Sequence, residues 1–524
     1  MTDNMKKIIK TGIIVISAII LALAADRFIF SEDAFNNRIS ITLDTKNGMT
    51  VKERVKDFND MCSVLKNNAP YIYDYEQLYG ISFDETASFY RDLVENTNSD
   101  FEYLAVNAAF LNNIPSFHMT LRIPDPDPDS FIYIANEYAG YEEASDYWKN
   151  AVLDSKNQYS SAEFRKFTYI GGSYYLEQDG TYTDIELISV NGIPISEFIL
   201  LFPSLNKLTY DHQSGIPFRE FIFFNNSIGE EYTVNLKHAD GTVSSETLFY
   251  SVPAQIAAKS DSYYAEKTDE TVILTAEQLM ETEITADGFY AFRNEELAYI
   301  YFNDFSRNAA NAIEYINTND LPEKIILDLR DNTGGLSYHA FLLAEMFSQN
   351  DITLNEFVYC SSPDYAPSEV QPIKKKELPF ETSFKELYRF SDDFGDIKGR
   401  CEKKYDLTVL VSYKTGSAAD NFSVYVKNNS LGKIIGAFST GGEAYGSPHM
   451  GVLEKSGLSF HYTPYMYVNP NNTVNNVYGT APDTYVKLDR EDFVLRQQLA
   501  ADGDNPYTFE NRLKWDKVLL KAIE

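Results

Sequence analysis

One serine in this chain stands where a nucleophile is commonly held. Residues 407–429 read LTVLVSYKTGSAADNFSVYVKNN, which predicts an apolar strand, a sharp Thr-Gly turn and then a helix. Ser417 lies at the start of that helix, where partial positive charge stabilises an alkoxide or an oxyanion. Serine hydrolases often hold their nucleophile on such a strand-to-helix turn. The window alone favours the plainer interpretation, a capping box formed by Ser417-Ala-Ala-Asp420, in which the serine only starts the helix.

A second segment has the composition of an oxyanion-binding turn. Residues 325–335 read IILDLRDNTGG, which predicts a buried strand that ends in polar residues and turns at Gly334-Gly335. Two glycines let the backbone aim N–H groups at a bound oxygen. Taken by itself, a strand followed by Gly-Gly is usually only a turn.

The elements that would position these residues follow from hydrophobic spacing. Residues 50–113 carry apolar side chains at helical spacing, and Pro115 ends that pattern. Residues 165–255 read as strands and turns, with a tight turn predicted at Asn191-Gly192. From about residue 285 strands alternate with helices, which predicts a parallel sheet with helices on its faces.

The chain is long enough for several domains, and these patterns divide it into six segments. We expect a signal peptide or membrane anchor over 1–30, a helical region over 31–125, a linker and helix over 126–164, a β module over 165–260, an α/β core over 261–490 with an insertion at about 363–403, and a helical tail over 491–524.

Composition excludes some functions. The formal net charge of −32 repels phosphate backbones, so we expect no nucleic-acid partner. The abundant Tyr and Phe favour a β-rich, aromatic-packed protein over a disordered one. Cys62, Cys360 and Cys401 lack metal-ligand spacing, and we interpret them as structural thiols rather than a disulfide framework. No motif indicates a metal or another cofactor.

The N-terminus predicts export. Lys6, Lys7 and Lys10 precede an uncharged, mostly apolar run from Thr11 to Ala25, and Ala22-Leu23-Ala24 offers a cleavage site. The run is short for a spanning helix, although an uncleaved anchor is the alternative if Ile8 and Ile9 are included. In both cases the bulk of the protein would be extracellular or on the cell surface.

Taken together, the motifs resemble the C-terminal processing peptidases, the family of the tail-specific proteases, the tricorn core and the retinoid-binding-protein repeats. The matching strings, in order, are ILDLRDNTGG at 326–335, TGSAAD at 415–420, Lys433-Ile-Ile-Gly436, Thr440-Gly-Gly442 and Gly479-Thr-Ala-Pro-Asp483. The stretch 184–197 resembles the PDZ-like module of many members. The resemblance covers about 295–490 and, more weakly, 50–260. It implies a multidomain α/β fold with a crotonase-like peptidase core, a PDZ-like β module and an N-terminal helical domain.

The resemblance also implies a catalytic set. The tail-specific branch places a lysine base where this chain has Gly442, so a Ser–Lys dyad is not expected. The tricorn-like branch takes a histidine from a window like Pro115-Ser-Phe-His118, which points to His118 as the base and to an assisting role for Ser116. That branch supplies a glutamate shortly before Gly-x-x-Pro-Asp, where this chain has Asn476 or its neighbour Asn475. An asparagine can orient an imidazole, but it cannot neutralise an imidazolium.

Two functions are then open. In the first, the chain is an exported serine endopeptidase that cleaves polypeptides, with Ser417 as nucleophile and the N–H groups of Gly334 or Gly335 and Ala418 holding the oxyanion. In the second, it is a catalytically inactive protein that keeps the fold and binds peptides, because Gly442 and Asn476 depart from the family pattern. The β module would either present an edge strand to a peptide or serve only in packing.

Overall fold

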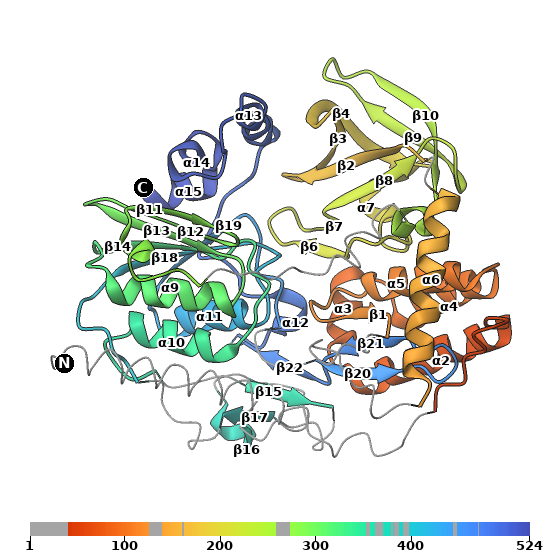
Figure 1. Ribbon diagram of the computed structural model, residues 1–524, viewed down its shortest axis with the longest axis horizontal. Coiled ribbons are helices and arrows are strands. Elements are labelled where there is room, and N and C mark those ends of the chain that lie inside the picture. Colours follow the sequence, from red (N-terminus) through yellow and green to blue (C-terminus); the bar gives the residue numbers. More distant parts are fainter. Residues whose placement is uncertain are drawn as a thin grey trace.

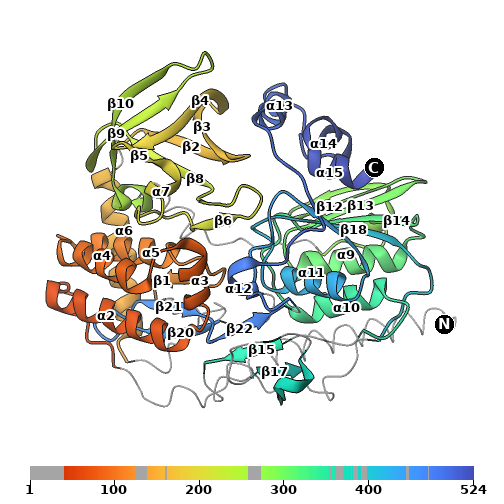
Figure 2. The same ribbon diagram turned by 180° about the vertical axis from the view of Figure 1, so that it is seen from behind.

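The computed structural model describes residues 40–124, 139–159, 162–257, 273–352, 357–361, 370–378, 381, 387–390, 398–443, 448–469 and 471–524. The fold is a multidomain α/β arrangement, as the sequence predicts (Figure 1). An α/β core and an N-terminal helical region lie side by side, and a β module lies next to the helical region (Figure 2). The expected signal peptide or anchor at 1–30, the proline-rich connector after Pro124 and most of the insertion at 363–403 lie outside the described residues.

The core is built on a seven-stranded sheet in the order β11-β12-β13-β14-β18-β19-β23. The strands are β11 (Glu283–Ala286), β12 (Phe289–Arg293), β13 (Leu297–Phe302), β14 (Lys324–Asp328), β18 (Asp406–Val411), β19 (Gly432–Gly436) and β23 (Thr484–Tyr485). The pairs from β13 to β23 are parallel, and β11, β12 and β13 pair antiparallel. The predicted parallel sheet is therefore present, with an antiparallel extension at one side.

Helices cover both faces of this sheet (Figure 1). One face carries α9 (Arg307–Thr318), α10 (Ser337–Phe347) and α11 (Ala418–Asn428), and the other carries α14 (Phe509–Trp515) and α15 (Lys517–Ile523). Helix α13 (Arg490–Ala501) packs beyond α14 and contacts β4 (Thr181–Val190) of the β module. In β14, Ile325 and Leu327 belong to one buried apolar cluster and Ile326 to another, because successive side chains of a strand point to opposite faces. A strand buried on both faces reads as a continuous apolar run, which is why its sequence shows no alternation.

The N-terminal helical region ends in a strand that joins the core. Its helices are α2 (Val51–Asn68), α3 (Ile72–Tyr79), α4 (Phe83–Glu95), α5 (Asp100–Asn112) and α6 (Tyr141–Tyr159). After α5, β1 (Thr120–Arg122) pairs with β21 (Ser459–Tyr462), which forms a hairpin with β20 (His449–Val452). This pairing brings the segment before Thr120 to the C-terminal part of the core, although more than 300 residues separate them in the chain.

The β module is a nearly closed sheet. Its strands are β2 (Phe164–Ile170), β3 (Ser173–Gln178), β4 (Thr181–Val190), β5 (Ile193–Pro194), β8 (Phe221–Asn225), β9 (Glu230–Lys237) and β10 (Val243–Tyr250), with α7 (Ile195–Phe198) and the pair β6 (Thr209–Asp211) and β7 (Ile216–Phe218) beside them. The order is β3-β2-β8-β10-β9-β4-β5, and a further pairing of β3 with β4 closes the sheet. Asn191 and Gly192 both have positive φ angles, as the predicted tight turn requires.

A small four-stranded sheet completes the described structure. It consists of β15 (Phe357–Cys360), β16 (Val370–Ile373), β17 (Leu387–Phe390) and β22 (Tyr465–Val468), and the short helices are η1 (Gln278–Met280), η3 (Lys375–Glu377) and α12 (Asn475–Tyr478). All three cysteines are free, and burial raises the pKa of the Cys62 and Cys360 thiols to about 12. Of the helices in the described ranges, none combines the length and the hydrophobicity needed to cross a bilayer.

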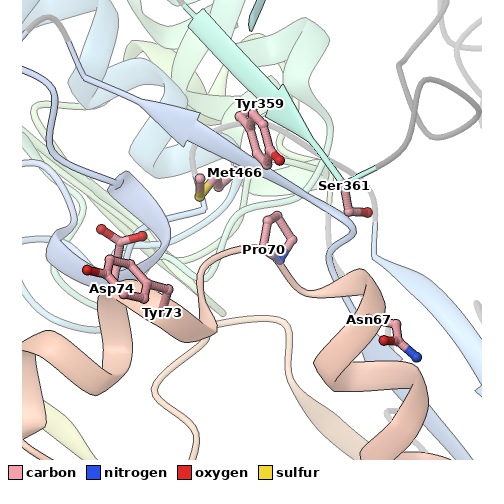
Figure 3. A pocket seen from close by; sticks show the side chains of 7 residues that line it. All are labelled: Asn67, Pro70, Tyr73, Asp74, Tyr359, Ser361 and Met466. Atoms are coloured by element: carbon pink, nitrogen blue, oxygen red, sulfur yellow. The ribbon is translucent and has the colours of Figure 1, made fainter. Parts of the chain in front are cut away.

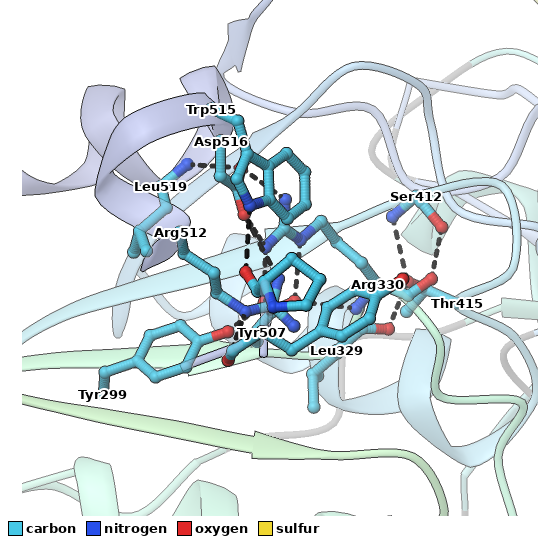
Figure 4. A network of polar contacts seen from close by, with 12 residues as sticks. Tyr299, Leu329, Arg330, Ser412, Thr415, Tyr507, Arg512, Trp515, Asp516 and Leu519 are labelled. Atoms are coloured by element: carbon cyan, nitrogen blue, oxygen red, sulfur yellow. Dashed lines mark hydrogen bonds and ion pairs between the residues drawn. The ribbon is translucent and has the colours of Figure 1, made fainter. Parts of the chain in front are cut away.

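A buried ionic network fastens the C-terminal helices to the sheet (Figure 4). The guanidinium of Arg330 binds both Asp328, at the end of β14, and Asp516, with contacts of 2.5–2.8 Å. Arg512 adds a 3.2 Å contact to Asp516, and the Tyr299 hydroxyl donates to Asp328 at 2.5 Å. Although burial alone raises the pKa of Asp328, the two arginines lower it to about 2, so this carboxylate is anionic.

Asp516 also interrupts the helical tail that the sequence predicts over 491–524, because it separates α14 from α15. Its carboxylate accepts the N–H of Leu519 and so starts α15, while its backbone leaves helical geometry. Leu329 and Arg330, which directly follow β14, also hold the loop that follows β18. Thr415 Oγ1 donates to the Leu329 carbonyl at 2.7 Å, and Ser412 Oγ donates to the Arg330 carbonyl. The network therefore connects the C-terminal helices to the turn that carries Ser417 (Figure 4).

Arg330→Met should lower the free energy of unfolding by about 3–5 kcal/mol, because it leaves two buried carboxylates without their shared cation. The control is Arg165→Met, which removes a solvent-exposed ion pair with Glu246 and should change stability by less than about 1 kcal/mol. Urea unfolding followed by tryptophan fluorescence measures both. Equal effects of the two substitutions would contradict a structural role for the network.

Candidate active site

Ser417 is held in a strained turn between β18 and α11. Its backbone has φ 52° and ψ −123°, in the left-handed half of φ space that side chains rarely occupy. The Ser417 N–H donates to the Gly442 carbonyl at 3.1 Å, and the Gly416 N–H donates to the Asn332 carbonyl at 3.1 Å. A serine at such a strand-to-helix turn presents its hydroxyl away from the backbone of the helix.

This geometry contradicts the capping-box interpretation. The Ser417 side chain makes no cap hydrogen bond to α11. Asp420 does not reach back to Ser417 but accepts hydrogen bonds from the hydroxyls of Thr440 and Thr480, at 2.6 and 2.7 Å. Asp420 thus anchors the Gly441-Gly442 loop, and Ser417 Oγ makes no hydrogen bond to any residue that the structure describes.

The glycine pair predicted to bind an oxyanion lies against Ser417. A Cβ on Gly334 would lie 2.6 Å from the Cβ of Ser417 and 3.0 Å from the backbone nitrogen of Ala418. The Gly334 N–H, however, donates to Asn332 Oδ1 at 3.0 Å, so its predicted place among the oxyanion donors is wrong. Within the described structure, the Gly335 and Ala418 N–H groups have no such partner. These two remain the candidate donors, and Gly334 instead provides room for the turn.

His118 is paired with a buried carboxylate. Its Nδ1 contacts Glu443 Oε2, and its backbone N–H donates to the same oxygen at 3.2 Å. The His118 side chain is 12% exposed, while that of Glu443 is fully buried. Because Nδ1 is engaged by Glu443, Nε2 is the ring nitrogen left to exchange a proton with another group.

Two hydroxyls complete the surroundings of Glu443. Ser116 Oγ donates to Oε1, and Thr463 Oγ1 donates to Oε2 at 3.0 Å. Burial alone raises the pKa of Glu443, but the His118 imidazole, the Ser116 hydroxyl and the charge of Lys207 lower it to about 2. Ser116, which was expected to assist the histidine, thus contacts the glutamate that pairs with it.

The Gly-rich loop joins the serine to the histidine pair. Gly416 and Gly442 form a parallel bridge, and Glu443 follows Gly442 directly. The Phe117 ring fills the space beside Gly416 and Gly441, where an added Cβ would come within 2.4 Å and 2.7 Å of ring atoms. The residue before Ser417 and the residue before His118 are thus in contact, although no hydrogen bond links Ser417 Oγ to His118 in the described structure. Such bonds are often formed only when substrate binds.

The expectation that Asn476 orients the histidine is not met. Asn476 Oδ1 accepts the backbone N–H of Tyr467 at 3.0 Å, and the Asn475 amide donates to Thr480 at 3.3 Å. The partner of His118 is Glu443, which sequence reasoning missed because it sought the acid near residue 479. The available signal was a carboxylate directly after Gly441-Gly442, in the loop where the tail-specific branch carries its lysine.

A lysine base is excluded at Gly442. This residue has φ +86°, and a Cβ there would lie 2.3 Å from the Asn475 carbonyl oxygen. Lys433 is exposed on β19, and Lys414 pairs with Glu220 of the β module at 2.8 Å. Of the other histidines, His339 binds the Phe305 carbonyl at 2.7 Å, and burial lowers the pKa of both His449 and His461 to about 4.

A pocket of about 300 Å³ lies on another side of the helical region (Figure 3). Helices α2 and α3 with the turn between them line one side, and the strands β15 and β22 line the other. The lining residues are Asn67, Pro70, Tyr73, Asp74, Tyr359, Ser361 and Met466. Neither Ser417 nor His118 is among them. No group of acidic, histidine or cysteine side chains in the described residues is arranged to hold a metal ion.

Comparison with known proteins shows which family the core matches. Residues 296–486 match peptidase family S41. A serine-to-alanine mutant of CPAF has a similar structure, with a TM-score of 0.50, 12% identity and coverage of 90% of this chain and 98% of that one. Mature CPAF complexed with lactacystin has a TM-score of 0.48 and 14% identity, covering 86% and 97% of the two chains. The photosystem II D1 C-terminal processing protease has a TM-score of 0.34 and 14% identity, covering 84% and 94%. A search of curated proteins gave no match.

The region that carries Ser417 therefore belongs to peptidase family S41. This match supports a serine peptidase, and it supports polypeptides as the class of substrate.

Gly334→Ala should greatly reduce the reactivity of Ser417, because the new methyl group would overlap the Ser417 Cβ and displace the turn. We expect labelling by a fluorophosphonate probe to slow by about 100-fold or more, in line with the effect of misplacing a reacting group. Gly503→Ala is the matched control, since Gly503 also has a positive φ but has open space around it. Equal labelling rates for the two variants would show that Gly334 is not needed beside the serine.

Proposed function

We propose that this protein is an exported serine endopeptidase that uses Ser417, His118 and Glu443. The observation that carries the proposal is that the strained Ser417 turn contacts the segments that hold the buried Glu443–His118 pair. The Ser417 N–H donates to the carbonyl of Gly442, next to Glu443, and the ring of Phe117, next to His118, packs against Gly416. Strained backbone at a serine is typical of a functional site, because folding alone would favour a relaxed turn.

The proposed chemistry follows the acyl-enzyme route. Ser417 Oγ attacks the scissile carbonyl carbon, and His118 Nε2 takes its proton and later delivers it to the leaving amine. Glu443 orients the ring through Nδ1 and stabilises the imidazolium as it forms. Ser116 and Thr463 keep Glu443 anionic and fixed. The Gly335 and Ala418 N–H groups hold the oxyanion, with the N-terminus of α11 beside them.

Export is proposed from the sequence. A basic segment, an apolar run and a small-residue site precede the described residues, and that order is typical of a signal peptide or an N-terminal anchor. The protein would then act outside the cell or at its surface. The free cysteines are compatible with that location, because Cys360 is buried, Cys62 and Cys401 are partly buried, and burial raises the pKa of all three thiols.

The position of Glu443 weakens the case for an inactive binding protein. That alternative rests on Gly442 and Asn476, which depart from the family pattern, and the pair of His118 with Glu443 removes the second of these reasons. A purely binding protein has no need of a buried carboxylate behind an imidazole, since burying a charge is unfavourable unless it is paired.

Ser417→Ala and His118→Ala should each abolish cleavage of an unfolded protein substrate, because the first removes the nucleophile and the second removes its base. Fragments are followed by mass spectrometry. His212→Ala, a histidine of the β module, is the control and should cleave as the wild type does. Cleavage by the Ser417→Ala protein would refute the proposed nucleophile.

Glu443→Gln should lower kcat by about 10² to 10⁴, because the amide cannot stabilise an imidazolium and favours the wrong ring tautomer. The matched control is Glu454→Gln, at a glutamate that pairs with Lys56 and Lys455 near the surface. Steady-state kinetics on a peptide substrate distinguish the two. A glutamine variant with wild-type kcat would remove Glu443 from the catalytic set.

A further inference from the structure

A lysine of the β module reaches the segment that carries His118. Lys207 lies between α7 and β6, and its Nζ donates to the carbonyls of Ser116 at 2.5 Å and Phe117 at 2.6 Å. These are the two residues before His118. The ammonium also lies 6.0 Å from the centre of the Phe117 ring. A single side chain from another region of the chain thus holds the backbone next to the proposed base.

The contacts of Lys207 and Phe117 act on this segment from different sides. The Phe117 ring is wedged beside Gly416 and Gly441, next to the Ser417 turn, while Lys207 binds the carbonyls of the same stretch. The backbone N–H and the ring of His118 are held by Glu443. If the ammonium were absent, the partly buried Phe117 carbonyl would lose its donor and the Ser116 carbonyl would keep only the Met119 N–H, so the segment could shift relative to Ser417.

The charge of Lys207 also acts on the carboxylate. Burial of the ammonium lowers the pKa of Lys207 to about 8, while Glu443 favours its charged form. In turn, Lys207 is one of the groups that lower the pKa of Glu443.

We propose that Lys207 is a positioning residue of the active site, supplied by the β module, that fixes His118 for proton transfer from Ser417. The inference rests on the proposed function and goes beyond it, because it makes the site a composite of three regions. The helical region provides Ser116 and His118, the core provides Ser417 and Glu443, and the β module provides Lys207.

The test compares full-length Lys207→Met with wild type, Lys207→Arg and Lys414→Met. Lys414 is the matched control because it also joins the β module to the core, through Glu220, but at a more exposed site. Steady-state kinetics on a peptide substrate should show kcat lowered about 10- to 100-fold in Lys207→Met, with KM changed by less than about 3-fold, because the change misplaces a reacting group and leaves substrate binding intact.

Lys207→Arg should recover part of kcat, since it keeps a cation and hydrogen-bond donors, and Lys414→Met should match the wild type. A folded Lys207→Met protein with wild-type kcat would overturn the proposal. So would a loss shared equally with Lys414→Met, which would indicate only domain attachment.

A second measurement separates this inference from the proposed function. The ring signal of His118, in protein labelled with ¹³C-histidine and assigned with His118→Ala, is compared in wild type, Lys207→Met and Lys414→Met. The signal should shift or broaden in Lys207→Met alone, whether or not the protein cleaves the chosen substrate, because the segment before His118 loses the contacts that hold it. An inactive wild type with that change in the variant would count against the peptidase proposal alone, and an unchanged signal in Lys207→Met would overturn the role of Lys207.

Discussion

The site depends on the burial of one carboxylate. Glu443 is fully buried, and a carboxylate in such a place is stable only if donors surround it. Its donors come from Ser116 and His118 at the end of the helical region and from Thr463 in the core. The helical region must therefore dock on the core for Glu443 to be satisfied. The pairing of β1 with β21 provides that docking and fixes the register two residues beyond His118.

The strained backbone nearby needs a rigid support. Ser417 and Glu443 both have positive φ angles without being glycine, and such conformations persist only where the surroundings hold them. Asn332, Thr415 and Asp420 provide hydrogen bonds on either side of the Ser417 turn. The Asp328–Arg330–Asp516 network lies directly behind, so the C-terminal helices help to hold a turn that is distant from them in sequence.

The loop after β19 is shaped by its two glycines. Gly441 and Gly442 pack against Phe117 and Asn475 so closely that no larger side chain fits. The next residue, Glu443, points its carboxylate toward the helical region. Where the tail-specific branch of the resembling family carries a lysine, this chain carries Gly442 and then a glutamate that contacts His118. His118 itself lies outside residues 296–486, the part of the chain that matches family S41.

The sequence by itself determined the local elements and the residues most constrained by local chemistry. Apolar periodicity located β14, β18 and α10, the Thr-Gly turn located Ser417, and the window around Pro115 located His118. Only the tertiary structure decided what surrounds them. Glu443 and Thr463 are 325 and 345 residues away from His118 in the sequence, and Lys207 is 90 residues away from Phe117. No local sequence pattern encodes contacts between residues so far apart. The order of the motifs pointed to Asn476 as the partner of His118, because it gives a residue's place along the chain. It does not tell which way the side chain points in the folded protein, and that of Asn476 binds Tyr467 instead. Hydrogen bonds to buried charges are set by packing, and packing is a property of the whole fold.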